Sequence, residues 1–213
     1  TPQHAMEVVH SGLDALIFSI DGIGQETYER YRAGGRLEQA VDGIRRVVAE
    51  KRRARATNPL VNLRFIVMKH NEHELQHLGR FASSLGVDLV TVRKFHMIHS
   101  GNPEHAEILK LTPDDPKYQL PPLDRAGGKP VRATANPCRN LWNCPTIHWD
   151  GTVCSCFMDS GETRPLGNLQ NRSFSEIWRG SSYRKLRKSF RSCWQRLSLC
   201  EYCSNGFEGG DVG

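Results

Sequence analysis

No cysteine occurs before Cys138, although the 213-residue sequence contains seven. No apolar run approaches the roughly 18 residues of a membrane helix, so we expect a chain that does not cross a membrane. A dinucleotide fingerprint is missing, because residues 21–24 (Asp-Gly-Ile-Gly) have neither the third glycine nor its spacing. No aromatic residue stands in the basic run at 45–55, and Phe190 in the run at 184–191 lies at core spacing with Tyr183 and Leu186. Despite a net charge of +6, these runs therefore indicate solvated helix faces and not a nucleic-acid surface.

The last third of the chain instead carries a concentration of cysteines. Cys138 and Cys156 are separated by 17 residues, whereas Cys200 and Cys203 form a short Cys-x2-Cys pair. Thiolates in this number suit an iron–sulfur cluster or a structural zinc ion. Zinc ribbons usually contribute two short pairs, so the single short pair favours the cluster. An odd cysteine count with such a spacing also favours a reducing cytoplasm over secretion.

A tight turn lies between the first two of these cysteines. Residues 147–149 and 153–156 flank Asp150-Gly151, which is a strong signal for a turn between two strands. Because side chains alternate along a strand, we expect Cys154 and Cys156 on the same face. This geometry leaves both cysteines open as metal ligands.

Six short segments of this region resemble, in their order, the SPASM domain of radical S-adenosylmethionine (SAM) enzymes, or its shorter twitch form. They are Cys138-Arg-Asn-Leu-Trp142, Trp149-Asp-Gly-Thr-Val153, Cys156-Phe-Met-Asp159, Leu166-Gly-Asn-Leu169, Ser175-Glu-Ile-Trp178 and Cys200-x2-Cys203. The resemblance implies one auxiliary [4Fe–4S] cluster, held by Cys138, Cys156, Cys200 and Cys203. A second cluster would require a further cysteine where this chain has Gly209.

Three other cysteines remain to be placed. Cys144 stands where some SPASM members have a ligand, so it competes with Cys138 or Cys156 for that role. Cys154 and Cys193 have no counterpart in the pattern, and we interpret them as small, buried or half-buried thiols.

The first hundred residues predict alternating strands and helices. A helix over 2–10 ends at Ser11-Gly12, and further elements are expected over 15–20 (a buried strand), 37–53 (helix), 61–68 (strand), 72–85 (helix) and 88–95 (strand). This alternation is typical of a right-handed parallel α/β unit. Three strands are too few to close a barrel.

These elements resemble the second half of the radical SAM partial barrel, its fourth to sixth strands. The resemblance rests on Ser19-Ile-Asp-Gly22, Tyr28-x3-Arg32, Asn71 and Leu85-Gly-Val-Asp88. It implies that Ser19 and Arg32 contact S-adenosylmethionine, since a hydroxyl and a guanidinium can both hold a carboxylate. Asp21 is a candidate for a ribose hydroxyl. The alternatives are a satisfied strand-end hydroxyl for Ser19 and a simple turn for Asp21.

The Cys-x3-Cys-x2-Cys loop that holds the radical-generating cluster of this family has no counterpart here. We therefore expect a C-terminal fragment that does not itself produce the 5′-deoxyadenosyl radical. The predicted fold class is α/β, with a partial barrel over 1–97, a substrate-proximal linker over 98–135 and a SPASM/twitch domain over 136–213.

The resemblance implies a cytoplasmic enzyme that uses S-adenosylmethionine and an auxiliary [4Fe–4S] cluster. Its expected partners are an external electron donor and a peptide or small-molecule substrate. The alternative is a zinc-stabilised basic module that binds nucleic acid without catalysis, with the same four cysteines as zinc ligands.

Overall fold

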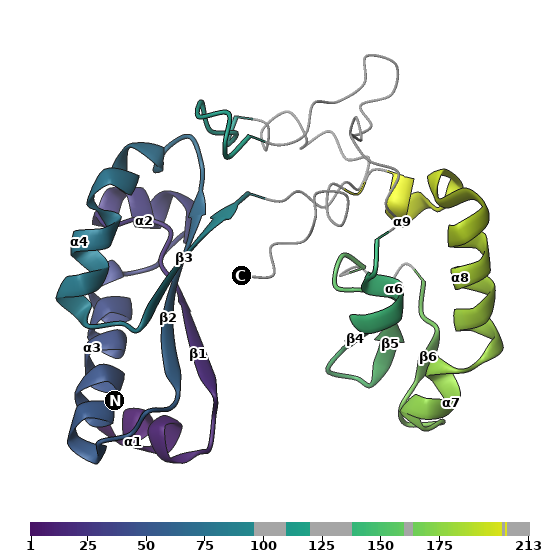
Figure 1. Ribbon diagram of the computed structural model, residues 1–213, viewed down its shortest axis with the longest axis horizontal. Helices are drawn as coiled ribbons and strands as arrows, with labels where there is room; N and C mark the ends of the chain where they lie inside the picture. Colours follow the sequence, from purple (N-terminus) through teal and green to yellow (C-terminus); the bar gives the residue numbers. More distant parts are fainter. Residues whose placement is uncertain (96–109, 120–137, 160–163, 202, 204–213) are drawn as a thin grey trace. The chain divides into compact units, whose positions relative to one another are not determined.

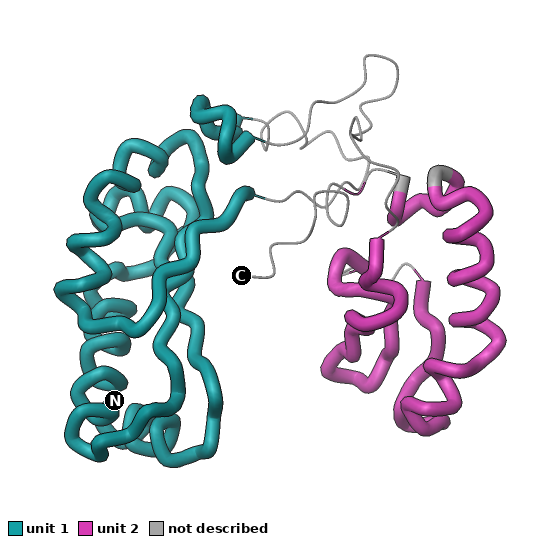
Figure 2. Tube along the Cα trace, in the orientation of Figure 1, with its two compact units in different colours: residues 1–95, 106–119 teal, residues 96–105, 120–213 magenta. Residues whose placement is uncertain are grey.

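The computed structural model describes residues 1–95, 110–119, 138–159, 164–201 and 203 (Figure 1). The chain divides into two compact units, which comprise residues 1–95 with 106–119 and residues 96–105 with 120–213 (Figure 2). Of the predicted linker over 98–135, only residues 110–119 are described. No helix among the described residues is long and apolar enough to cross a membrane.

Unit 1 is built on a three-stranded parallel sheet with the order β1-β2-β3. The strands are β1 (Ala15–Ser19), β2 (Leu60–Val67) and β3 (Leu89–Lys94), and the helices are α1 (Pro2–His10), α2 (Gln25–Tyr31), α3 (Leu37–Ala54) and α4 (Leu75–Leu85). A short 3₁₀ turn, Glu72–Glu74, leads into α4. The predicted strand–helix alternation is confirmed, with shifts of one to three residues at most element ends.

Hydrophobic periodicity explains why the two longer helices pack on the sheet. In α3, residues at helical spacing form a buried stripe that includes Val41, Ile44 and Val48. In α4, Leu78, Ala82 and Leu85 are buried in the same way. The α4 helix ends at Gly86, whose φ of +71° is the left-handed conformation that favours glycine.

The helices cover one face of this sheet (Figure 1). The side chains of Val61, Leu63, Phe65 and Val67 all point to that face and are fully buried. On the opposite face Ile17, at the middle of β1, is 44% exposed. The prediction of a buried strand over 15–20 is therefore wrong for this face, because among the described residues of unit 1 the core packs against the other side of the sheet.

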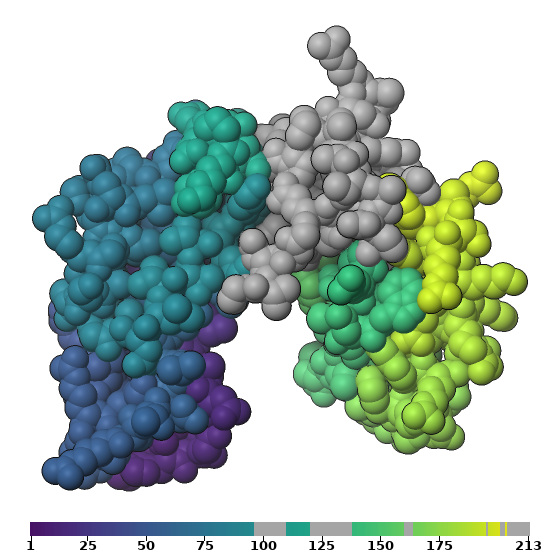
Figure 3. All heavy atoms as spheres, in the orientation of Figure 1, coloured from purple at the N-terminus to yellow at the C-terminus, as the bar shows by residue number. Residues whose placement is uncertain are grey.

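Residues 110–119 belong to unit 1 and pack against the segment that follows β2 (Figure 3). The Lys69 amide donates a 2.9 Å hydrogen bond to the Leu111 carbonyl, and its ammonium pairs with Asp114 at 2.7 Å. The Glu72 carboxylate accepts the backbone amides of Asp114 and Asp115 at 2.9 and 3.1 Å. Part of the predicted linker is thus anchored at the carboxyl end of β2.

Unit 2 combines a small antiparallel sheet with short helices. Its described elements are α6 (Asn140–Asn143), β4 (Thr146–Ile147), β5 (Thr152–Cys154), β6 (Gly167–Asn168), α7 (Phe174–Trp178), α8 (Ser181–Cys193), a 3₁₀ turn (Trp194–Arg196) and α9 (Ser198–Glu201). The predicted hairpin is confirmed as β4–β5, and its turn contains Gly151 at a φ of +85°. Strand β6 pairs with β5, so the order is β4-β5-β6.

Candidate functional site

Four cysteines of unit 2 line one small cavity. Cys138, Cys156, Cys200 and Cys203 surround a volume of about 20 Å³, together with the apolar side chains of Leu141, Met158, Phe190 and Leu199 and with Asn140. These are the four ligands that the sequence resemblance implies. They come from segments that are far apart in sequence, so only the folded domain brings them together.

Each cysteine is placed by the end of a short element. Cys138 precedes α6, and its sulfur accepts a 3.4 Å hydrogen bond from the Asn140 backbone amide. Cys156 follows β5, whereas Cys200 lies in α9 and Cys203 just beyond that helix. The Cys203 amide donates to the Cys200 carbonyl at 3.3 Å, which holds the short pair in a turn. Hydrogen bonds to sulfur of the kind seen at Cys138 tune iron–sulfur clusters.

The remaining cysteines do not belong to the described lining of this cavity. Cys144 is exposed after α6, and Cys193 lies at the end of α8. Cys154 is fully buried at the end of β5, where its carbonyl accepts the hydroxyl of Tyr183 at 3.2 Å. Because the strand ends at Cys154, the alternation that would have placed it beside Cys156 does not extend to Cys156.

The environment of Cys156 is mostly apolar. Burial raises the pKa of its thiol, and this outweighs hydrogen bonds from the Met158 and Asp159 backbone amides and the Ser155 hydroxyl. A thiol in such a pocket stays protonated at neutral pH unless a metal takes the place of the proton.

An arginine from α8 holds helix α6, which closely follows Cys138, in place. The Arg187 Nε donates to the Leu141 carbonyl at 2.9 Å, and its Nη1 donates to the Trp178 carbonyl at 3.1 Å. The guanidinium lies over the rings of Trp178 and Tyr183, at 4.1 and 4.5 Å from their centroids. The interpretation of run 184–191 as a solvated helix face is therefore wrong for Arg187. Its spacing in the sequence could have indicated this role, because Arg187 lies one helical turn after the core residue Tyr183.

The four thiols favour a metal centre, whereas the size of the cavity does not show a preformed one. Four thiols are the ligands that iron–sulfur clusters use. A volume of about 20 Å³ has room for about one water molecule, and no three described His, Cys, Asp or Glu side chains converge as metal ligands. The four thiols thus fit the chemistry of an iron–sulfur cluster.

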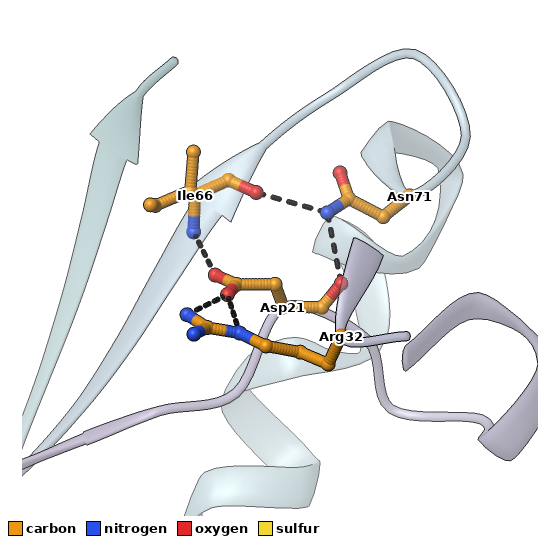
Figure 4. Close-up of polar contacts among 4 residues, drawn as sticks. All are labelled: Asp21, Arg32, Ile66 and Asn71. Carbon is orange, nitrogen blue, oxygen red and sulfur yellow. Dashed lines mark hydrogen bonds and ion pairs between the residues drawn. The ribbon is translucent and has the colours of Figure 1, made fainter. Parts of the chain in front are cut away.

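A second polar site lies at the carboxyl end of the sheet in unit 1 (Figure 4). Asp21, just beyond β1, is fully buried, and its Oδ2 accepts the Nε of Arg32 at 2.8 Å. Its Oδ1 accepts the Ile66 amide at 2.9 Å. Asn71 donates to the carbonyls of Asp21 and Ile66 at 3.0 and 2.9 Å, so the ends of β1 and β2 are tied together.

This network determines which of the predicted cofactor-binding side chains in unit 1 remain available to bind a ligand. Both carboxylate oxygens of Asp21 are engaged within the protein, which leaves its side chain no exposed acceptor. The side chain of Arg32, at the end of α2, is 37% exposed and keeps Nη1 outside the hydrogen bonds to Asp21. Ser19 is half-buried at the last position of β1.

Comparison with known proteins identifies the C-terminal region. Residues 138–205 match the family model of the SPASM domain, which is described as an iron–sulfur cluster-binding domain. This match argues against a zinc site for the four cysteines, which all fall inside its bounds.

Two known proteins match most of the chain. One is a tungsten-containing aldehyde ferredoxin oxidoreductase cofactor-modifying protein of Pyrococcus furiosus, which is 21% identical over 211 residues and is matched by 86% of this chain. The other is a solved structure of native anSMEcpe with bound AdoMet and the Kp18Cys peptide, with a TM-score of 0.53 and 13% identity over 94% of this chain.

The chain spans 57% of the length of the first relative and 62% of that of the second. At 13% identity the solved structure establishes the fold alone, and its match covers 94% of this chain. Residues 138–205 of this chain therefore match a SPASM iron–sulfur cluster-binding domain, and the chain shares its fold with this solved structure.

Proposed function

We propose that this chain is the C-terminal part of a radical SAM enzyme, and that its SPASM domain holds one auxiliary [4Fe–4S] cluster through Cys138, Cys156, Cys200 and Cys203. One observation carries the proposal: these four thiols line a single cavity inside the region that matches a cluster-binding family. When bound, the cluster would supply an electron acceptor for a substrate radical, or an anchor for the substrate.

In unit 1 we assign Ser19 and Arg32 to the carboxylate of S-adenosylmethionine. The geometry supports this assignment, because the carboxyl ends of parallel strands are where ligands of α/β sheets bind. Asp21 has a different role in the proposal. Its buried carboxylate orients the Arg32 guanidinium instead of binding a ribose hydroxyl.

The substrate, electron donor and compartment belong to the proposal as well. The solved structure contains a bound peptide, and the curated relative is named as a cofactor-modifying protein. We extend to this chain a peptide or small-molecule substrate, an external electron donor and a cytoplasmic location.

The test is anaerobic purification of the chain, followed by iron and zinc analysis of alanine variants. The wild type should be brown, absorb near about 400 nm and contain about four iron atoms. Replacing Cys138, Cys156, Cys200 or Cys203 by Ala should each remove most of that iron.

The other three cysteines supply matched controls. Cys144→Ala, Cys154→Ala and Cys193→Ala should keep nearly the wild-type iron content, because these residues are absent from the described cavity lining. Full iron loading in Cys156→Ala would contradict the ligand assignment. A colourless wild type with stoichiometric zinc would contradict the proposed cofactor.

A further inference from the structure

The face of the unit 1 sheet opposite the helices changes character along its length. Strand alternation places on this face Ile17 and Ser19 of β1, Asn62, Arg64 and Ile66 of β2, and Leu89, Thr91 and Arg93 of β3. Near the amino ends of the strands it is apolar, with Leu89 51% exposed. Near their carboxyl ends it is polar.

Arg64 is the residue of this face that calls for explanation. It is half-buried, and its Nε is inaccessible to solvent yet has no hydrogen-bond partner. None of the ion pairs among the described residues includes Arg64. A buried donor of a charged group without a partner is costly, and such a group is more often satisfied by a ligand or by ordered water.

The surroundings of Arg64 favour an anion over water alone. The strand residues on this face include no Asp or Glu, and Asp21, just beyond β1, is already paired with Arg32. Among the described residues, the positive charge of Arg64 therefore has no acidic partner.

The position of Arg64 also relates it to the proposed cofactor site. Arg64 is the cross-strand neighbour of Ser19 in the parallel register of β1 and β2. Asn62, two residues earlier, accepts the Thr91 hydroxyl at 2.9 Å, which fixes the neighbouring part of the face. A group bound at Arg64 would thus lie beside a group bound at Ser19.

We propose that Arg64 binds an anionic group of the substrate, a carboxylate or a phosphate, next to S-adenosylmethionine. The inference rests on the proposed function for the identity of the neighbouring cofactor. It narrows the substrate to molecules that carry an acidic group close to the carbon that reacts. Arginine suits this role because its planar guanidinium can donate two parallel hydrogen bonds to either anion.

The experiment follows the side-chain Nε–H resonances of arginine in the cluster-loaded 213-residue chain by NMR. Inorganic phosphate and acetate are titrated separately, with sodium chloride at matched ionic strength as the reference. The Arg64 resonance should shift saturably with at least one of the two anions, and the more effective anion identifies the acidic group.

Two variants and one control make the result specific. Arg64→Met should weaken anion binding at least about tenfold, because it removes a charged hydrogen-bond donor. Arg64→Lys should retain part of the binding, because lysine keeps a charged donor. Arg46→Met is the control, since Arg46 pairs with Asp42 on α3, away from this face. Its removal should leave the Arg64 response unchanged.

Iron content and S-adenosylmethionine binding, measured on the same samples, separate the two hypotheses. A chain that loads iron and binds S-adenosylmethionine, but shows no saturable Arg64 response, overturns this inference and leaves the proposed function standing. Displacement of phosphate from Arg64 by S-adenosylmethionine also overturns it, because the anion site would then belong to the cofactor. A chain that responds at Arg64 but takes up no iron overturns the proposed function, and the substrate assignment with it.

Discussion

At the scale of single residues, the buried carboxylate of Asp21 organises the polar end of unit 1. It receives an arginine on one oxygen and a strand amide on the other, while Asn71 satisfies its backbone carbonyl (Figure 4). A buried carboxylate is tolerated when its charge is paired and its lone pairs are occupied. Removing that charge therefore affects both the fold and the orientation of Arg32.

We expect Asp21→Asn to lower the free energy of unfolding of unit 1 by about 2–3 kcal/mol, because Arg32 loses its buried counter-charge. Urea denaturation followed by circular dichroism measures this change. Asp42→Asn is the matched control, since it removes only an exposed pair with Arg46, and it should cost less than about 1 kcal/mol. Equal losses in the two variants would contradict the structural role of Asp21.

At the scale of elements, helix α8 packs against the cluster-binding region and stabilises it. Its inner side buries Tyr183 and Phe190, and Phe190 lines the cysteine cavity. Arg187, between them, ties α8 to the carbonyls of Leu141 in α6 and Trp178 in α7. The segment that carries Cys138 is thereby held by a helix more than 40 residues away in sequence.

Arg187→Met should destabilise unit 2 by about 1–3 kcal/mol, since two carbonyls lose a charged donor and two rings lose a stacked cation. Iron content after anaerobic purification should fall as well, because α6 would no longer be fixed beside the other cysteines. Arg187→Lys should rescue little, since an ammonium cannot reproduce the planar fork. Arg184→Met, on the exposed side of the same helix, is the control and should match the wild type in iron content and thermal stability.

At the scale of the whole molecule, each hydrophobic cluster among the described residues falls within one of the two units. The core of unit 1 joins one face of a sheet to its helices, whereas unit 2 contains smaller clusters around short elements. A small domain of this kind depends strongly on its metal. Among the described strands, β1 pairs only with β2, so its other edge resembles the exposed edges that promote self-association.

Removal of the cluster should therefore destabilise unit 2 and leave unit 1 unchanged. We expect Cys200→Ala, compared with wild type by hydrogen exchange under anaerobic conditions, to lose protection across residues 138–201 while residues 13–95 exchange as before. In the loaded protein, residues 13–95 should exchange faster than unit 2 or self-associate. Uniform, strong protection of residues 13–95 in a monomer would contradict this expectation.

Local patterns in the sequence predicted most of the helices and strands, and also the four cysteines that line the cavity. Helical periodicity predicted α3 almost to its ends, and Asp150-Gly151 predicted the β4–β5 hairpin, since both depend on residues close together in the chain. The order and spacing of the cysteines, with their resemblance to a known pattern, pointed to the four that line the cavity. Sequence alone left Cys154 open as a ligand.

Tertiary structure decided what depends on distant partners. The end of β5 at Cys154, together with the packing of α6, α8 and α9, placed Cys156 and not Cys154 in the cavity lining. Asp21 looked like a turn residue or a ligand, and became a buried acceptor only through an amide 45 residues away. The apolar sequence of β1 predicted a strand buried on both faces. Which face a core covers, however, depends on the packing of the other elements. Side-chain pairing across such separations leaves no local pattern, which is why these roles were visible only in the folded chain.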